Sequence, residues 1–237
     1  RLVKEAFVDP ELRARVQMSS ANSINLGRLL PQAVYYAASS LRIRQESGQP
    51  ASYIIPSGNL GNSVACIWAK KMGFPIDRVL LAHNANRTVV DFLATGELRP
   101  RPSIPTLASA MDVGSPSNLE RMLALYPDAA ALGAQLQAFC IDDDAIRARI
   151  RADRDRYGEV WCPHTATAAE VYAGLSAAER GARQWVLVAT AHPAKFREIV
   201  EPLVGPVEVP ENLRRLYDLP SSCSEIEPTL AALRTAT

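Results

Sequence analysis

The 237-residue chain has an ordinary globular composition: 48% of its residues are hydrophobic, 22% are charged, and its formal net charge is +1. This balance excludes a disordered polar tail. It also argues against a nucleic-acid partner, because the arginines of segment 143–157 alternate with aspartates on a predicted solvated helix and form no basic patch.

The cysteine spacing and the apolar runs exclude two further classes of protein. The four cysteines form no CxxC pair, and the three histidines show no ligand spacing, so neither a disulfide framework nor a metal site is predicted. The longest apolar runs are far too short to cross a bilayer, and the sequence begins with no signal-peptide pattern. We therefore expect a cytoplasmic protein without a membrane partner.

The first residues already follow a helical pattern. Leu2, Val3, Ala6 and Phe7 show helical spacing without a preceding cap, and the first residue is not methionine. We expect the chain to be a fragment of a longer protein.

Apolar runs bounded by turn residues predict buried strands, and longer helical patterns fill most of the gaps between them. The predicted strands are 51–56, 78–84, 137–142, 159–164 and 183–190, and the predicted helices are 28–44, 61–72, 88–95, 117–126, 143–157, 165–178 and 193–203. This alternation predicts an α/β fold with a mostly parallel sheet flanked by helices. Segment 97–118, rich in Pro and Ser, is predicted to be a long connection of the kind that often lines a site.

The turn after the first predicted strand, "SGNLGN" at 57–62, has the composition of an anion-binding loop. Gly58 and Gly61 allow a tight bend and close approach to a ligand, so that main-chain N–H groups point into one concavity at a helix N-terminus. A GxGxxG pattern and a Walker lysine are both absent, which favours a mononucleotide-like phosphate. Glycine and asparagine also occur in such turns for backbone reasons alone, and this alternative stays open.

The segment "PSGNLGN" resembles the phosphate-binding loop of pyridoxal 5′-phosphate (PLP) enzymes of fold type II, the tryptophan synthase β family. Three further segments resemble threonine synthases in their family order: 19–36, 106–122 and "TAHPAKF" at 190–196. Segment 163–172 is a weaker match, and the resemblance extends from about residue 1 to 220. It implies that 1–237 is the C-terminal part of a fold type II catalytic domain, incomplete at its N-terminus, with 1–27 a remnant of the preceding, smaller lobe.

The resemblance implies a PLP-dependent lyase that converts O-phosphohomoserine and water to threonine and phosphate. It implies that main-chain groups of the turn surround the cofactor phosphate and that the Thr190 hydroxyl lies near the pyridine nitrogen. The implied cofactor-binding residues are Gly58, Asn59, Leu60, Gly61, Asn62 and Thr190. A strand-end hydroxyl that bonds to a local backbone group is the alternative for Thr190.

For the substrate phosphate, the resemblance implies Ser23, Arg28 and Asn59. The planar guanidinium of arginine suits bidentate contact with phosphate oxygens. The alternative for Arg28 is an exposed arginine at the start of a helix. We expect His164 and His192, each beside a proline, to be positioning residues, not metal ligands.

No catalytic residue is assigned in this chain. Lys195 is rejected as the Schiff-base lysine because the family's lysine lies much earlier, in a segment before residue 1. Lys70 and Lys71 end the helix after the turn, where cations complement the helix dipole. We therefore expect the chain by itself to be inactive and to need the missing N-terminal portion of the same enzyme as its partner.

Two other functions stay open from the sequence. One is another fold type II enzyme, such as a threonine or serine dehydratase. The other is a non-catalytic protein that binds a phosphorylated metabolite, for which the absent lysine is the support.

Overall fold

The computed structural model of the chain describes residues 2–23 and 25–236. The chain divides into two compact units. The terminal unit comprises the segment up to Asn22 and the segment from Val209 onward, and the central unit comprises Ser23–Glu208. Within the described residues, no helix is both long enough and apolar enough to span a membrane.

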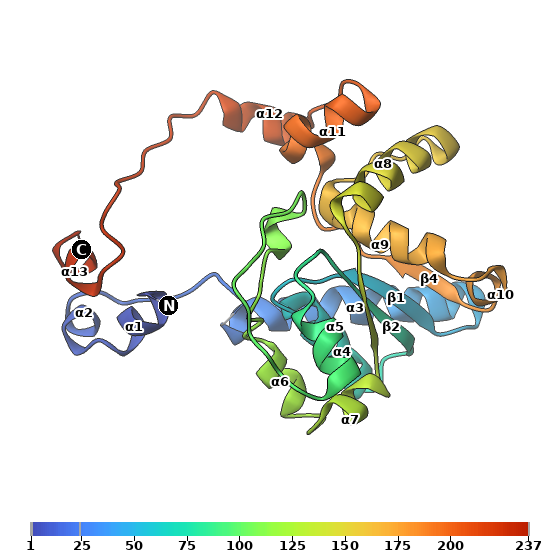
Figure 1. Cartoon of the computed structure of the whole chain (residues 1–237), viewed down its shortest axis with the longest axis horizontal. Coiled ribbons are helices and arrows are strands. Elements are labelled where there is room, and N and C mark those ends of the chain that lie inside the picture. Colours follow the sequence, from blue (N-terminus) through green and yellow to red (C-terminus); the bar gives the residue numbers. More distant parts are fainter. Residues whose placement is uncertain (1, 24, 237) are drawn as a thin grey trace. The chain divides into compact units, whose positions relative to one another are not determined.

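A parallel sheet forms the middle of the central unit (Figure 1). Its strands are β1 (Ala51–Pro56), β2 (Ile76–His83), β3 (Gln137–Cys140) and β4 (Gln184–Leu187), in the order β3-β2-β1-β4. Ile54 of β1 is in register with Leu80 on one side and Leu187 on the other. Because all strands run the same way, the segments that follow β1, β2 and β4 leave the sheet at one edge.

Helices cover both faces of the sheet. Successive side chains of a strand point to opposite faces, and in these buried strands both sets are apolar and must be covered. Tyr53 and Ile55 face a core shared with α3 (Leu26–Ser47), α4 (Gly61–Lys71), α5 (Thr88–Thr95), α6 (Leu119–Leu123) and α7 (Ala129–Gly133). Ile54 faces the other side, where it packs with Ala168 and Val171 of α9 (Pro163–Gly174). The expected α/β class with a parallel sheet flanked by helices is confirmed.

The outer helices of the α9 side pack through a separate apolar cluster. Ile146 and Ile150 of α8 (Asp143–Tyr157) contact this cluster together with Ala166 of α9 and Val200 of α11 (Arg197–Val204). The remaining short elements of the central unit are the 3-10 helix η1 (Ser109–Met111), α10 (Ala177–Gly181) and the 3-10 helix η2 (Pro193–Phe196).

The predicted strand 159–164 is wrong. Residues 159–162 are irregular, and α9 begins at Pro163. Pro163 has no N–H for a strand ladder but suits the first turn of a helix, and the Cys162 sulfur accepts a hydrogen bond from the main-chain N–H of Thr165 at 3.4 Å. The run therefore leads into a helix. Val160 and Trp161 are half-buried and Cys162 is buried, and an apolar pattern alone does not distinguish such a segment from a strand.

The predicted helix boundaries also shift at several ends. The first long helix begins at Leu26, two residues early, because the Asn25 side chain accepts a hydrogen bond from Gly27 at 2.9 Å and caps it. The helix predicted at 193–203 is divided into η2 and α11. Segment 97–118 is irregular apart from η1, as expected of a long connection.

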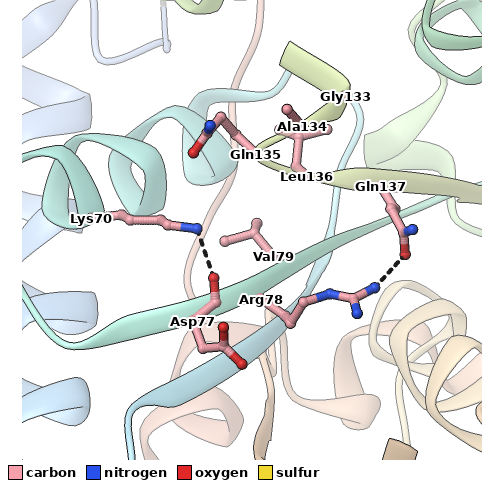
Figure 2. A pocket seen from close by; sticks show the side chains of 9 residues that line it. All are labelled: Lys70, Asp77, Arg78, Val79, Gly133, Ala134, Gln135, Leu136 and Gln137. Atoms are coloured by element: carbon pink, nitrogen blue, oxygen red, sulfur yellow. Dashed lines mark hydrogen bonds between the residues drawn. The ribbon is translucent and has the colours of Figure 1, made fainter. Parts of the chain in front are cut away.

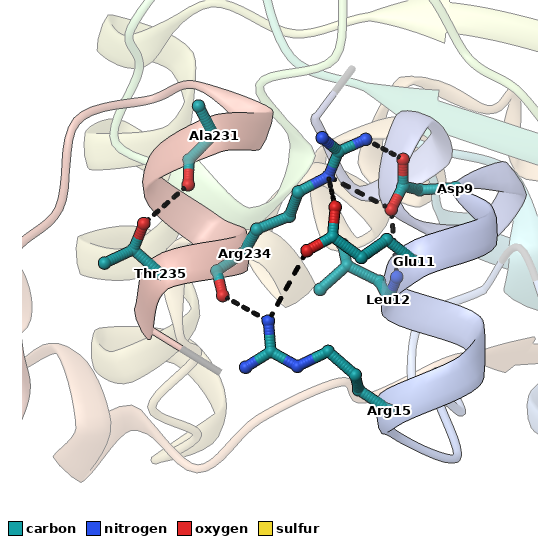
Figure 3. A network of polar contacts seen from close by, with 7 residues as sticks. All are labelled: Asp9, Glu11, Leu12, Arg15, Ala231, Arg234 and Thr235. Atoms are coloured by element: carbon teal, nitrogen blue, oxygen red, sulfur yellow. Dashed lines mark hydrogen bonds and ion pairs between the residues drawn. The ribbon is translucent and has the colours of Figure 1, made fainter.

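The terminal unit joins the two ends of the chain through an ionic network (Figure 3). It contains α1 (Leu2–Val8), α2 (Pro10–Arg15), α12 (Glu211–Tyr217) and α13 (Leu230–Ala236). The Arg234 guanidinium binds the Asp9 carboxylate, which also caps α2 through Leu12, and Arg15 donates to the Arg234 carbonyl at 2.8 Å. The hydrogen bond from Arg234 is the main cause of the lowered pKa of Asp9. The division falls after Asn22, and the expectation that 1–27 is the remnant of another lobe stays a prediction.

A buried histidine ends β2. His83 is 2% exposed, and its Nε2 has no hydrogen-bond partner in the described part of the chain. Burial lowers the pKa of His83 from 6.5 to about 4, although a hydrogen bond with the main chain of Ser57 opposes the shift. As pH falls from 6.5 to about 4, the unfolded chain takes up a proton at this position before the folded chain does. The folded state therefore loses stability across that window.

We predict that His83→Gln flattens the acid dependence of stability. Between pH 6.5 and about 4, the free energy of unfolding of the unmodified protein should fall by about 3 kcal/mol more than that of the variant. Urea unfolding at a series of pH values measures this difference. His192→Gln, at an exposed histidine, is the control and should leave the pH profile unchanged. Parallel profiles for the unmodified protein and His83→Gln would contradict the prediction.

Candidate functional site

The turn that follows β1 is held against two distant segments of the chain. A Cβ atom added to Gly58 would lie 2.6 Å from the Met111 Cα, and one added to Gly61 would lie 2.9 Å from the Ser23 Cβ. The left-handed conformation of the turn falls on Leu60, with φ 63°, and not on either glycine. Both glycines therefore let the turn approach other segments of the chain itself, and their close approach to a ligand stays a prediction.

The main-chain N–H groups of residues 59 to 62 in this turn have no hydrogen-bond partner among the described residues. They precede and begin the 11-residue helix α4, where unpaired N–H groups and the helix dipole together attract an anion. These N–H groups are therefore available to an anion, and that they bind a phosphate stays a prediction.

Asn59 and Ser23, two of the predicted substrate-binding residues, are in direct contact. The Asn59 side-chain amide donates to the Ser23 hydroxyl at 2.9 Å, and Asn118 donates to the same hydroxyl at 3.1 Å. The main-chain N–H of Ser117 donates to the Asn59 carbonyl oxygen Oδ1 at 2.7 Å. The network fixes the turn to the segments on both sides, and Asn118 was not expected from the sequence.

Arg28 lies on the first turn of α3 with an exposed side chain. The structure shows no ion pair or side-chain hydrogen bond of Arg28 with another described residue, so it does not join Arg28 to Ser23 or Asn59. Both the phosphate-binding role and the exposed-arginine alternative agree with this placement.

The side chain of Asn62 is oriented by a buried tyrosine. The Tyr36 hydroxyl donates to Asn62 Oδ1 at 2.5 Å, and Tyr36 is 3% exposed. Burial raises the pKa of Tyr36 well above its ordinary value, so the tyrosine stays neutral. Sequence reasoning singled out segment 19–36, which ends at Tyr36, but not Tyr36 itself, because its partner Asn62 is 26 positions away.

Segment 97–118 is tied to the carboxyl end of β2 by polar side chains. Asn84 donates to Thr106 and to the Asp112 carboxylate, both at 2.8 Å. Asn86 donates to the Ile104 carbonyl at 2.8 Å. These bonds hold the connection at the sheet edge, where its Met111 meets Gly58.

After β4 the chain leaves the sheet at the same edge as the turn, and Thr190 lies in this segment. The N–H of Val188 donates to the Ile54 carbonyl at 3.0 Å, so the chain runs beside β1 as it approaches Thr190. The side chain of Thr190 is exposed, and its N–H donates to the Thr165 hydroxyl at 3.2 Å. Thr190 lines an open pocket of about 620 Å³ together with Cys162, Thr165 and His192.

Cys162 is the residue of this pocket that sequence reasoning missed. Its sulfur lies 3.9 Å from the Thr190 hydroxyl oxygen and 3.2 Å from that of Thr165. Burial by itself raises the pKa of Cys162, but the nearby His164 side chain and the hydrogen bonds from Thr165 outweigh this and lower the pKa to about 7. Its position just before "PH" in the sequence was the available signal, since a residue before a helix-starting proline is a cap candidate.

The two expected positioning histidines have local partners. The Nε2 of His164 accepts a hydrogen bond from the Ala110 N–H at 3.1 Å, and the Nδ1 of His192 accepts one from the Ala194 N–H at 3.1 Å. His164 thus connects α9 to η1, and His192 caps η2.

A second pocket, of about 300 Å³, lies at the opposite end of the strands (Figure 2). There Lys70 donates to the Asp77 carbonyl at 2.7 Å, and Arg78 donates to Gln137 at 2.7 Å. Asp77 and Gln137 are near or at the amino ends of β2 and β3, whereas the turn and Thr190 follow carboxyl ends. Lys70 is therefore placed away from the candidate site.

Comparisons with known proteins find similarity to threonine synthases. Residues 165–236 match the family model described as "Threonine synthase, C-terminal". Threonine synthase from Haemophilus influenzae is 37% identical, over 98% of this chain and 54% of its own length. The chain thus spans about half the length of the curated relatives it matches.

Solved structures match in fold as well. The crystal structure of threonine synthase from Escherichia coli is 34% identical and has a TM-score of 0.88, over 99% of this chain and 54% of that one. The crystal structure of PLP-bound threonine synthase from Brucella melitensis is 29% identical with a TM-score of 0.86, over 99% and 55%. The expected fold type II architecture is confirmed by these matches.

We predict that Gly58→Ala is destabilising although alanine is only one methyl group larger. The added Cβ would overlap the main chain of Met111, which cannot rotate away, so a loss of about 1–3 kcal/mol in the free energy of unfolding is expected. Urea unfolding measures it. The matched control is Gly133→Ala, where no atom lies within 4 Å of the added Cβ, and which should change stability little. Equal effects of the two substitutions would show that overlap with Met111 does not change the free energy of unfolding.

Proposed function

Because this chain is related to the threonine synthases and matches their C-terminal portion, we propose that it forms the cofactor-phosphate and substrate-phosphate sites of such an enzyme. The complete protein converts O-phosphohomoserine and water to threonine and inorganic phosphate, with PLP as cofactor. The rest of the enzyme is the partner of this chain.

One observation carries the proposal: the unpaired N–H groups of residues 59 to 62 lie in the same turn whose Asn59 contacts Ser23. The main-chain N–H groups of the turn are enough to bind one phosphate. A turn that joins a main-chain cradle to polar side chains from a second segment suits a reaction in which both the cofactor and the substrate carry a phosphate.

The described residues fit PLP at two points. The N–H donors at the start of α4 suit its phosphate, and each hydrogen bond to that charged group contributes about 1.5–3 kcal/mol. The hydroxyl of Thr190, exposed at the same sheet edge, suits its pyridine nitrogen. When bound, PLP supplies the electron-withdrawing ring that stabilises negative charge at the substrate Cα.

The chain's own groups hold the cofactor in one protonation state. Thr190 presents a neutral hydroxyl, whereas a carboxylate at that position would favour a protonated pyridine nitrogen. His83 near the turn is kept neutral by burial, which lowers its pKa to about 4. The anion site therefore depends on neutral donors and a helix N-terminus.

Ser23, Asn59 and Arg28 are assigned to the substrate phosphate. Ser23 and Asn59 are already in contact, and Asn59 lies in the turn itself. The exposed guanidinium of Arg28 lies on the helix that starts three residues after Ser23, and it brings the positive charge that the two neutral side chains lack.

We assign the Schiff-base lysine to the partner portion of the enzyme. Lys70 binds the Asp77 carbonyl at the opposite end of the strands, and Lys195 is exposed on η2. Neither lysine is placed at the turn. The isolated chain is expected to release no phosphate.

The test uses the complete protein that contains this chain. Supplied with PLP, it should release inorganic phosphate from O-phosphohomoserine and form threonine in equal amount. Ammonia released from threonine or serine, without any reaction of O-phosphohomoserine, would show a dehydratase. Binding of O-phosphohomoserine with no turnover and no PLP uptake would show a binding protein.

We predict that Arg28→Ala weakens the substrate far more than the cofactor. Loss of a charged hydrogen bond to phosphate should raise KM for O-phosphohomoserine by roughly 10- to 150-fold, while the Kd of PLP changes less than about twofold. Steady-state kinetics and PLP titration measure the two effects. Arg42→Ala, on the same helix and exposed, is the control, because Arg42 pairs only with Glu46 in the described structure. Equal weakening of substrate and cofactor would favour a structural role for Arg28.

A further inference from the structure

Helix α3 presents apolar side chains on two opposite faces. Leu29, Ala33 and Tyr36 are buried in the core of the central unit. On the opposite face, exposed apolar residues recur every three or four positions, which is the spacing of one helix face. The outer α3 face, as we call it, consists of Leu26, Leu30, Val34, Ala38 and Leu41, with Tyr35 beside them.

The large side chains of the outer α3 face are well exposed. Leu30 is 57% exposed, Val34 61% and Tyr35 71%. Single apolar side chains are common on protein surfaces, but a continuous row of them along one helix indicates a surface that another segment covers. A helix that is apolar on both sides is typical of a position between two layers of structure.

The row of apolar residues stops at one place along the helix. From Leu26 to Leu41 the only charged residue of α3 is Arg28, which is assigned to the substrate phosphate. After Leu41 every exposed residue of the helix is charged or polar. Gln45, for example, continues the line of the outer α3 face with a polar side chain. The surface to be covered is therefore the first part of α3 and not the whole helix.

This part of α3 adjoins the candidate site. The helix starts three residues after Ser23, whose hydroxyl accepts a hydrogen bond from Asn59 of the turn at 2.9 Å. Further along, Tyr36 on the buried face donates to Asn62 at 2.5 Å. A segment that covers the outer α3 face is therefore separated from the turn by little more than one helix diameter, about 10 Å.

The proposed site needs a segment that the described residues do not supply. Neither Lys70 nor Lys195 is placed at the turn, and the proposed function assigns the Schiff-base lysine to the N-terminal portion. The chain spans about half the length of the curated relatives it matches. On the proposed function, a portion of comparable size brings the lysine to the turn from outside this chain.

We propose that the outer α3 face is the docking surface for the N-terminal portion of the complete protein. An apolar segment of that portion packs against Leu30 and Val34 and so holds the lysine beside the turn. The inference rests on the proposed function, which assigns the lysine to that portion. The occupant is this portion and not a second copy of the chain, because only this portion is needed at the turn to complete the site.

The first test identifies what covers the outer α3 face in the complete protein. Tyr35 is replaced by the photoreactive analogue p-benzoylphenylalanine, the protein is irradiated, and the cross-linked peptides are identified by mass spectrometry. We expect a cross-link to a peptide that precedes residue 1 of this chain. The control has the same analogue at Tyr157, which is exposed at the end of α8 among charged residues and should form no such cross-link.

Each other result of this experiment overturns the inference. A cross-link to residues 2–22 or 209–236 would show that the terminal unit covers the face. A cross-linked dimer would show a second copy of the chain. If Tyr35 forms no cross-link at all, the face is not covered at that position.

The second test measures protection without a bulky probe. Val34→Cys and Gln45→Cys lie on the same side of α3, one inside the apolar row and one beyond it, and both positions are exposed in this chain. In the complete protein, with Cys223→Ser to remove the exposed native thiol, maleimide should label Val34→Cys at least roughly tenfold more slowly than Gln45→Cys. Equal labelling rates would overturn the inference.

The failure of this inference and the failure of the proposed function can be distinguished. A complete protein that releases no phosphate from O-phosphohomoserine removes the proposed function, and with it the reason for the lysine at the turn. A protein that releases phosphate, but whose outer α3 face is labelled freely or cross-links elsewhere, removes only the docking surface.

Discussion

The candidate site depends on a close approach between three segments at the carboxyl edge of the sheet. The turn after β1 is pressed against Met111 at Gly58 and against Ser23 at Gly61, and Asn59 and Asn118 close the contact with hydrogen bonds. Only glycine fits at the first two positions without displacing the neighbouring segment. Because the segments fix one another, the free N–H groups at the start of α4 are held in place before any anion arrives.

The second constraint on the candidate site is that the side chains around the turn are uncharged. The groups around the turn are amides, hydroxyls and a histidine kept uncharged by burial, and the tyrosine that orients Asn62 is also neutral. A helix N-terminus supplies the attraction for a phosphate without a buried positive charge, whose desolvation would be costly. Arg28, which does carry charge, is exposed, so its guanidinium keeps its hydration.

Much of the fold could be predicted from the sequence, and the predictions that were wrong have identifiable causes. Strand β1, the turn and α4 were found because a buried run, two glycines and a helical pattern follow one another locally. The predicted strand 159–164 failed because Val160 and Trp161, which precede α9, are as apolar as strand residues, and an apolar run does not show that a helix starts at Pro163. Cys162, Tyr36 and Asn118 were missed because each contacts a partner at least 26 positions away in the sequence.

The sequence by itself determined the local elements and, through its motifs, the family resemblance, because turn chemistry and helical periodicity are properties of neighbouring residues. Only the tertiary structure decided what the glycines of the turn contact, which residue adopts the left-handed conformation, and that Thr190 has a thiol beside it. These facts depend on which strands are adjacent in the sheet, and strand order is set by packing over the whole unit.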